Sequence, residues 1–444
     1  MAQAPREQWG SRLGFVLAAV GSAVGLGNMW RFSYLASEHG GGAFLLLYIG
    51  MTALVGLPVM LAEMTLGRGS GRSPIFALAH FGGRGWSLLG WLFVATGFLI
   101  FSYYSVIAGW TLRYAVETIF LGFSGDPGGR FEALATGGPA VAWHLGFVAL
   151  CAFVVMGGIR GGIERASVVL MPSLFALVVG IAIYAATLDG AAAGYSRYLT
   201  FEIREILSLD VLREAAGQAF FSLSLGMGVM ITYASYLSPR DNLPNESLVI
   251  AGADFGVAFL AGLVVFPLIF ALGLSDKVGE STVGALFITL PETFATMGAA
   301  GRVVGSLFFL ALAVAALTSA ISMLEVVVAS AIDGLGISRH TASIAAGAAI
   351  ALLGIPSALS LDVLGLLDQV AGNLLLILGG LLVTVFVGWG MDDPVAEVER
   401  GAAGVRWFGL WRMLLRTVVP LLLLVVLVSS CGATLGTIQG LGGG

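Results

Sequence analysis

Long apolar runs, separated by short polar stretches, follow one another along almost the whole chain. Most have about 20 residues or more, the length with which an α-helix crosses the hydrocarbon core of a bilayer. They lie near 13–37, 43–67, 87–121, 140–158, 166–187, 213–237, 248–274, 303–332, 341–356, 365–389 and 410–434. The pattern predicts an all-α polytopic membrane protein with about eleven transmembrane helices.

Glycines interrupt the first run within Gly21-Ser22-Ala23-Val24-Gly25-Leu26-Gly27-Asn28. Such a segment is a poor helix former, and it is tolerated inside a membrane only where its backbone lines a cavity. A second interruption, Gly226-Met227-Gly228, falls in the sixth run. A GxG pair alone is also typical of close helix packing, since the chain has 64 glycines. Two broken helices at matching places in two halves predict an inverted-repeat transporter with its site near the midplane.

Composition and charge support a membrane class and exclude others. Apolar residues make up 58% of the 444 residues and charged residues 11%, and the mean hydropathy is +0.97. The net charge of −5 gives no indication of a nucleic-acid partner. The four histidines lack metal-ligand spacing and no nucleophile or phosphate-loop motif occurs, so no enzyme is predicted. Arginines gather on one side of the runs, which places the N-terminus in the cytoplasm and the C-terminus outside.

Four motifs carry a family resemblance. They are the segment 6–14, the run from Gly21 to Phe32, the stretch 40–44, and the run from Gln218 to Tyr236. The chain resembles the neurotransmitter:sodium symporter family, in particular its bacterial amino-acid transporters. The resemblance implies a LeuT-type 5+5 inverted repeat with discontinuous first and sixth helices. Residues 1–12 would form a cytoplasmic segment, 13–187 the first repeat, 188–389 the second, and 390–444 an inner loop and an eleventh span.

The resemblance also implies two sodium sites. One would use the Ala23 carbonyl, the side chains of Asn28, Ser222 and Asp254, and the substrate carboxylate. The other would use the carbonyls of Gly21, Val24 and Ala315 and the hydroxyls of Thr318 and Ser319. Taken alone, the small residues 315–320 indicate helix packing, with hydroxyls bonded to their own backbone. Together with the broken first helix, they favour an ion site.

Asp254 is an acid within an apolar run, where a charge is costly unless it is paired or bound to a metal. The alternative is a position near a helix end that reaches water. Relatives with Asn at this place bind chloride near the positions of Tyr48, Gln218 and Ser222. Since Asp254 brings its own negative charge and residue 258 is Ala, we expect transport independent of chloride.

The substrate pocket follows from the broken helix and the resemblance. Amides of Leu26 and Gly27 would bind a carboxylate, together with the Tyr104 hydroxyl. Tyr104 could instead be packing only. Gly25 stands where amine-transporting relatives carry an Asp, which favours an amino acid. The remaining lining would be apolar or hydroxyl-bearing, which indicates a hydrophobic L-amino acid: Ser22, Ala23, Ile100, Phe221, Ser222, Ser224, Met227, Ser319 and Met323.

Paired charges on both sides are predicted gates. By resemblance, Arg31 and Asp368 would close the outside with Phe221 as a lid. Arg6 and Asp333 would close the inside, supported by Trp9, Ser235 and Tyr236. Each charge could instead be an ordinary interfacial residue.

Two further acids lie within apolar runs. Glu63 would cap the amides freed by the helix breaks, or would be a protonated structural acid. Glu325 would be a proton-linked site or an acid of the inner vestibule that faces water.

These predictions combine into a multi-pass symporter of the bacterial inner (cytoplasmic) membrane. It would use sodium to import a neutral hydrophobic L-amino acid by alternating access. Its partners would be the amino acid and the lipid bilayer, and the oligomeric state stays open. The alternatives are a proton-coupled carrier of the same fold, and a channel or sensor that binds the amino acid without accumulating it.

Overall fold

The computed structural model describes residues 6–123, 125–201, 208–271, 285–402 and 407–442, and their regular elements are all helices. The first half contains α1 (Arg12–Ala23), η1 (Gly27–Arg31), α2 (Phe32–Glu38), α3 (Gly42–Met51), η2 (Thr52–Gly56), α4 (Leu57–Ser70), α5 (Pro74–Gly82), η3 (Arg84–Trp86), α6 (Ser87–Leu121), α7 (Pro127–Ala135), α8 (Gly138–Met156), η4 (Ile159–Glu164), α9 (Arg165–Ala185) and α10 (Ala191–Leu199).

The second half contains α12 (Leu209–Ser222), α13 (Val229–Ala234), α14 (Leu243–Ala271), η6 (Ala285–Thr289), α16 (Leu290–Thr296), α17 (Gly298–Leu335), α18 (Arg339–Leu359), α19 (Leu361–Leu367), η7 (Asp368–Leu375), α20 (Leu376–Val385), η8 (Phe386–Gly390), α21 (Pro394–Glu399), α22 (Phe408–Arg416) and α23 (Val418–Gly442).

Helices long and apolar enough to cross a membrane dominate the described residues. Nine helical stretches meet that test by length and composition, and the bent pair 12–23 and 27–38 makes a tenth. The predicted run 213–237 corresponds to α12 and α13, which residues 223–228 separate. The protein is therefore a multi-pass helical membrane protein, as the apolar pattern predicted.

Both predicted helix breaks are present. In the first, α1 ends at Ala23, the following Val24 has an extended backbone with φ −80° and ψ 98°, and the chain turns by 61° into the next helical stretch. In the second, Gly226 has φ 77°, and a Cβ there would lie 2.1 Å from the carbonyl oxygen of Leu376. Only glycine satisfies both the left-handed backbone and this close approach. The neighbouring Ser224 also has a positive φ, 54°.

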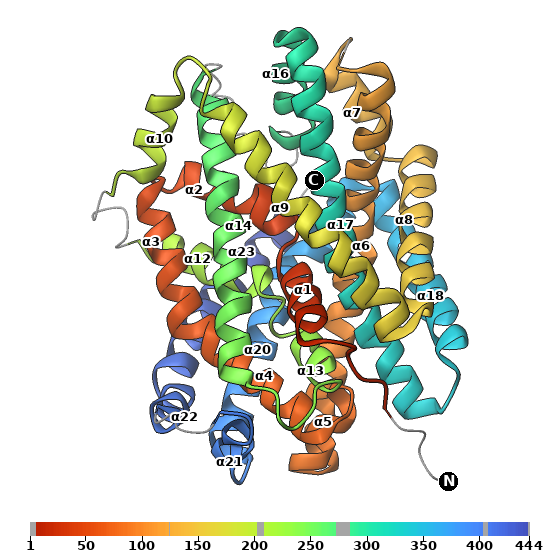
Figure 1. Cartoon of the computed structure of the whole chain (residues 1–444), viewed down its shortest axis with the longest axis vertical. Helices are drawn as coiled ribbons and strands as arrows, with labels where there is room; N and C mark the ends of the chain where they lie inside the picture. The colour runs from red at the N-terminus through yellow and green to blue at the C-terminus, as the bar shows by residue number, and fades with distance from the viewer. Residues whose placement is uncertain (1–5, 124, 202–207, 272–284, 403–406, 443–444) are drawn as a thin grey trace.

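The broken helices lie at the centre of the molecule. Figure 1 shows α1 and α13 surrounded by longer helices, and α17 packs against α1, α6, α8 and α9. The short helices α7, α10 and α16 lie at the end away from the N-terminus, whereas α5, α21 and α22 lie at the end near it (Figure 1). The breaks therefore lie between these two groups of short helices (Figure 1).

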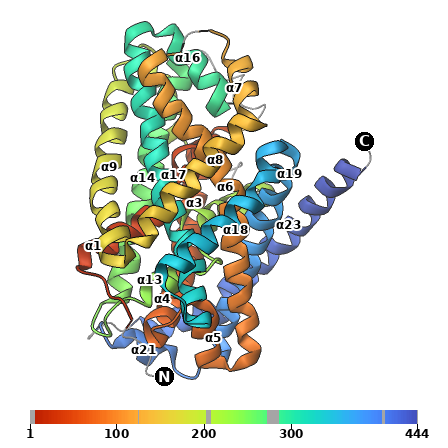
Figure 2. The same cartoon turned by 90° about the vertical axis from the view of Figure 1, so that its right-hand side faces the viewer.

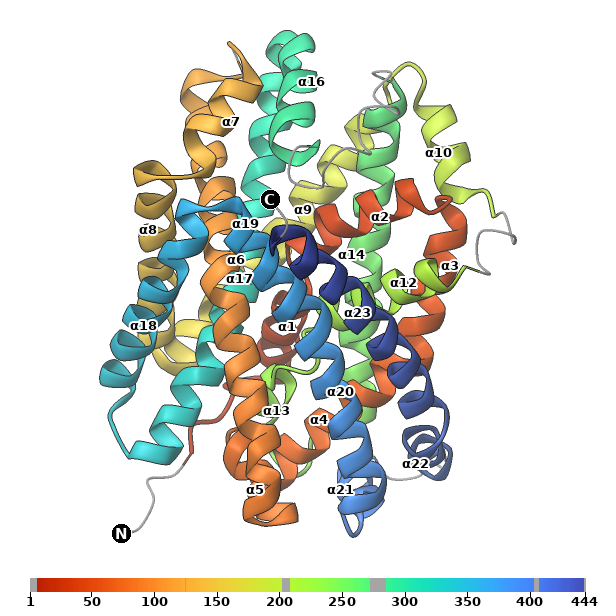
Figure 3. The same cartoon turned by 180° about the vertical axis from the view of Figure 1, so that it is seen from behind.

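Two of the connections between the apolar runs contain helices of their own. The loop around 122–139 includes α7, and the loop around 189–212 includes α10. The connection before α17 forms η6 and α16 from residue 285 onward. The last helix, α23, packs along α20 and η7 (Figure 3) and leans away from the bundle in the perpendicular view (Figure 2).

Candidate functional site

A fully buried polar cluster joins the two broken helices to α14. The Asn28 side chain donates to Asp254 Oδ1 at 2.6 Å and to Ser222 Oγ at 2.8 Å. Ser222 donates to the same carboxylate oxygen at 2.7 Å, and Tyr48 donates to Asp254 Oδ2 at 2.8 Å. Asp254 is 0% exposed, so the alternative of an acid that reaches water is wrong. The structure brings together the three side chains predicted for the first sodium site.

The residues predicted for the second sodium site lie where α1 packs on α17. A Cβ added to Gly21 would lie 3.1 Å from Thr318 Cβ, so the two chains approach closely here. The Thr318 hydroxyl donates to the carbonyls of Val314 and Ala315, at 3.2 and 3.1 Å. That is the bond to its own helix that the packing alternative describes. The approach of a broken helix end to hydroxyls nevertheless provides only oxygen ligands, as a hard cation requires.

Gly25 is the point where the first break faces α6 and α17. A Cβ there would lie 3.2 Å from the Tyr104 hydroxyl and 3.3 Å from Ser319 Oγ. The Leu26 amide donates to the Tyr104 hydroxyl over 3.4 Å. A backbone amide and a phenol therefore converge on one spot, where a carboxylate would find two donors.

Most of the residues predicted for the rest of the pocket are buried apolar side chains and serines. Ile100, Met227 and Met323 are at most 3% exposed. The serines cross-link the breaks, since Ser224 Oγ donates to the Ser22 carbonyl at 2.9 Å and Ser22 Oγ lies 2.7 Å from Ser322 Oγ. Ala23 is buried beside them.

The outer end closes differently from the prediction. Arg31 Nη2 lies 3.6 Å from Glu214 Oε2, and the guanidinium also donates to Gln218 and Asn373. Asp368, its predicted partner, instead accepts a 2.9 Å bond from Tyr103. Within the described chain, therefore, Arg31 and Asp368 do not form the predicted direct pair.

Phe221 lies under Arg31, whose Cζ is 5.6 Å from the ring centroid. A Cβ on Gly27 would lie 2.9 Å from Phe221 Cδ1, so the ring covers the broken helix. The predicted lid and the predicted gate arginine are thus in contact.

The inner end holds the predicted pair. Arg6 Nη1 donates to both oxygens of Asp333, at 2.8 and 2.9 Å, and its Nη2 donates to Ser235 Oγ at 2.7 Å. Its Cζ lies 4.7 Å above the Tyr236 ring. Trp9 donates from Nε1 to the Tyr233 carbonyl at 3.0 Å. Five side chains predicted from sequence, Arg6, Trp9, Ser235, Tyr236 and Asp333, therefore meet at the inner end of the site.

Glu325 does not face water, so that alternative is wrong. Its side chain is 0% exposed and lies 2.7 Å from Arg339 Nη1, with Tyr236 donating to Oε1 at 2.6 Å. Arg339 also pairs with Glu7 at 2.8 Å. Glu325 therefore belongs to the ionic network that closes the inner end.

Glu63 touches the second break. Its Oε1 accepts a 2.8 Å bond from the Gly226 amide, and the residue is fully buried. This amide would otherwise lack a partner because the helix ends before it.

Sequence reasoning missed Glu214, Ser322 and Arg339. Glu214 precedes Gln218 by four residues and Ser322 follows Ser319 by three, so helical spacing places each on a face already implicated. Arg339 lies beyond the end of α17, where no periodicity connects it to Glu325. No group of three or more His, Cys, Asp or Glu suited to a metal occurs in the described residues.

Two broken helices that meet at a buried, oxygen-rich site, with paired charges above and below it, define a helical membrane transporter rather than an enzyme. A comparison with known families matches residues 6–123 and 133–436 to the Sodium:neurotransmitter symporter family. The chain belongs to that family.

Named relatives agree with this assignment. The chain is 38% identical to the uncharacterized sodium-dependent transporter YhdH of Bacillus subtilis, over 96% of this chain and 98% of the relative. It is 33% identical to the uncharacterized sodium-dependent transporter MJ1319 of Methanocaldococcus jannaschii, over 96% and 90%. The crystal structure of MhsT in complex with L-phenylalanine matches with a TM-score of 0.87 and 41% identity, covering 96% of this chain and 100% of MhsT.

Proposed function

We propose that this protein imports a neutral, hydrophobic L-amino acid together with sodium. The observation that carries the proposal is the convergence of the Leu26 amide and the Tyr104 hydroxyl at Gly25. In our proposal the buried side chains of Ile100, Met227 and Met323 form the walls of the pocket. The donors suit a carboxylate, and the walls suit an apolar side chain. The complex of MhsT with L-phenylalanine supports this substrate class.

The relatives described as sodium-dependent support sodium as the coupling ion. In our proposal one ion binds at Asn28, Ser222 and Asp254, with the Ala23 carbonyl and the substrate carboxylate. A second binds between the Gly21 and Val24 carbonyls and the α17 groups Ala315, Thr318 and Ser319. Because the first ion would contact the substrate itself, each would favour binding of the other.

We further propose that transport needs no chloride. Tyr48 and Ser222 both donate to Asp254, and residue 258 is a buried alanine. A fixed carboxylate already supplies the negative charge that would balance sodium there. An added anion next to it would be repelled.

Alternating access would exchange the two closures. The outer one comprises Arg31, Glu214 and Phe221, and the inner one comprises Arg6, Asp333 and the Glu325–Arg339 pair. We place the N-terminus in the cytoplasm and the C-terminus outside, in a bacterial cytoplasmic membrane. The reason is that arginines gather on the side of the apolar runs that carries the N-terminus.

Uptake of labelled phenylalanine, leucine and tryptophan into proteoliposomes tests the proposal. Accumulation above the external concentration is expected under an inward sodium gradient and not when potassium or choline replaces sodium. Uptake driven by a proton gradient without sodium would support the proton-coupled alternative. Saturable binding without accumulation would support the sensor.

A further inference from the structure

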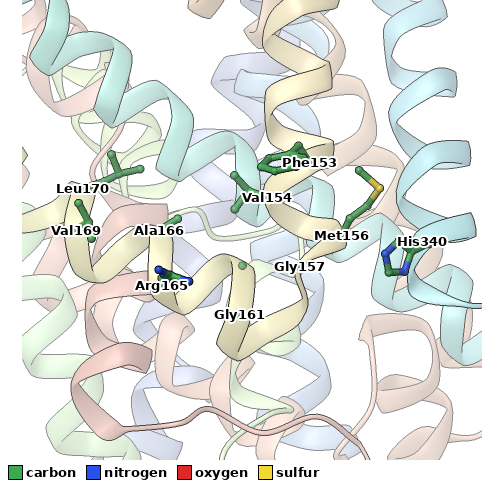
Figure 4. Close-up of a pocket in the computed structure, with 11 residues that line it drawn as sticks. Phe153, Val154, Met156, Gly157, Gly161, Arg165, Ala166, Val169, Leu170 and His340 are labelled. Carbon is green, nitrogen blue, oxygen red and sulfur yellow. The ribbon is translucent and has the colours of Figure 1, made fainter.

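An open hollow lies on the lateral surface of the helix bundle, away from the substrate site. It has a volume of about 580 Å³ and is formed by the end of α8, the turn η4 and the start of α9, with His340 of α18 beside it. Figure 4 shows Phe153, Val154 and Met156 on one side and Ala166, Val169 and Leu170 on the other. A second hollow of about 520 Å³ adjoins it and shares Met156, Gly157, Gly161 and His340.

The first hollow faces the membrane. Only 33% of the apolar windows of 138–156 and of 159–185 is buried within the protein, so most of their surface points outward. Phe153 and Val169, which line the hollow, are 71% and 61% exposed. Apolar side chains this exposed on a membrane-spanning helix contact acyl chains.

The second hollow, which adjoins the first, is lined by basic side chains. Arg160 and Arg339 line it with His340, and Arg165, at the start of α9, lines the adjoining first hollow. Glu7 is its one acidic lining residue and is already paired with Arg339. Within the described chain, the side chains of Arg165 and His340 have no hydrogen bond or ion pair of their own.

We propose that this double hollow binds an anionic phospholipid of the leaflet on the N-terminal side. Its phosphate would lie between Arg160, Arg165 and His340, and an acyl chain would run past Phe153 and Val169. Basic groups at the end of a span, next to an apolar groove, are the combination that such a lipid matches and that a zwitterionic or soluble ligand does not. This inference rests on the membrane assignment and not on the transported substrate.

The site adjoins the inner closure. Arg160 donates from Nε to the Gln8 carbonyl at 3.0 Å, and the Ile159 amide donates to Glu7 at 2.7 Å. The same short segment carries Arg6 and Trp9 of the inner gate. A lipid phosphate on Arg160 would therefore act on the stretch of backbone that holds the gate closed.

Native mass spectrometry of the purified full-length protein tests the proposal, with phosphatidylglycerol or phosphatidylcholine of matched chains added. We expect preferential retention of phosphatidylglycerol. Arg165→Gln should weaken it about fivefold, the factor that corresponds to about 1 kcal/mol for each basic residue near an anionic surface. Gly161→Leu should also weaken it, since a Cβ at Gly161 meets nothing within 4 Å and the side chain would fill the hollow.

Two matched variants serve as controls. Arg72→Gln removes an exposed arginine outside the hollow, and Gly146→Leu adds the same side chain to an open place on α8. Both should leave retention unchanged. Equal retention of both lipids, or unchanged retention in Arg165→Gln and Gly161→Leu, would overturn the proposal. Displacement of the lipid by soluble glycerol phosphate at equal concentration would reduce the site to a phosphate site and would also overturn it.

Discussion

At the scale of single residues, a few buried polar groups determine what this site can bind. Tyr104, Asn28 and Asp254 are at most 3% exposed, and each keeps a hydrogen-bond partner. A buried polar group without a partner is costly. A ligand that displaces one of these hydrogen bonds must therefore supply an equivalent bond, or its binding is weakened. Single substitutions therefore separate substrate recognition from ion recognition.

Removing the phenol should weaken substrate binding. In Tyr104→Phe we expect KM for phenylalanine to rise about tenfold or more, since a hydrogen bond to a charged group contributes about 1.5–3 kcal/mol. Steady-state uptake measures this. Tyr198→Phe is the control, because that hydroxyl donates to the Phe259 carbonyl of α14 and not to a residue of the predicted pocket. An equal KM in both variants would contradict the proposed role of Tyr104.

Neutralising the acid of the central cluster should make transport depend on an anion. Asp254→Asn keeps the size of the side chain but removes the charge that would balance sodium. We expect uptake without chloride to fall about tenfold or more and chloride to restore part of it. Asp362→Asn, an exposed acid of α19, should change nothing. Wild-type uptake that stops without chloride would refute chloride independence.

The outer arginine provides a subtler test. Its pair with Glu214 is half-exposed, with side chains 23% and 25% accessible, so a contribution of at most about 1 kcal/mol is expected. Glu214→Gln should therefore speed substrate release about twofold to fivefold. Asp210→Asn, which is 73% exposed and contacts Arg213, is the matched control. Release of labelled substrate after dilution distinguishes them, and identical rates would show that Glu214 does not hold the gate.

At the scale of elements, specific backbone and side-chain contacts fix the conformation of the helix breaks. Gly226 approaches the Leu376 carbonyl, and its own amide is capped by Glu63. Ser224, with its positive φ, is tied to the Ser22 carbonyl of the other break. The two breaks therefore form one connected unit at the centre of the molecule.

A methyl group at the second break should disrupt this unit. Gly226→Ala places a Cβ 2.1 Å from the Leu376 oxygen and imposes a left-handed backbone, which costs about 1–2 kcal/mol for a residue with a Cβ. We expect a clear loss of folded protein and of thermal stability by detergent chromatography. Gly217→Ala in α12, where a Cβ meets nothing within 4 Å, should be tolerated. Equal stability of the two would mean that the break is not constrained here.

At the scale of the whole molecule, the two closures are unequal in this conformation. The inner one joins Arg6 to Asp333 and Ser235, and Glu7 to Arg339, which itself holds Glu325. In the outer one, Arg31 lies 3.6 Å from Glu214 and donates to the neutral amides of Gln218 and Asn373 at 3.2 and 3.3 Å. This imbalance favours a state closed toward the N-terminal end.

Removing the inner arginine should shift the population toward an open inner side. In Arg6→Ala we expect faster hydrogen exchange in residues 7–23 and weaker substrate binding, because two bonds to Asp333 are lost. Exchange mass spectrometry in detergent, with and without sodium, measures it. Arg72→Gln is the control on the same side. Unchanged exchange in Arg6→Ala would show that other contacts close this end.

Several features could be predicted from the sequence alone. Runs of about 20 apolar residues must become membrane helices, because lipid leaves the backbone no other partner. The glycines at 21–27 and 226–228 predict the breaks, because such segments are poor helix formers. Asn28 and Ser222 lie next to these breaks in the sequence. The resemblance to known relatives supplied Asp254, Tyr104 and the inner pair of Arg6 and Asp333, which no spacing within the chain connects.

Only the tertiary structure decided which helix faces meet. It gave Arg31 the partner Glu214 instead of Asp368, buried Glu325 against Arg339, and brought Ser322 to Ser22. These pairings span up to 300 residues of chain and depend on shifts of a few ångströms between helices. Sequence periodicity sets the face of a helix that is buried, whereas packing of the whole bundle sets what that face contacts.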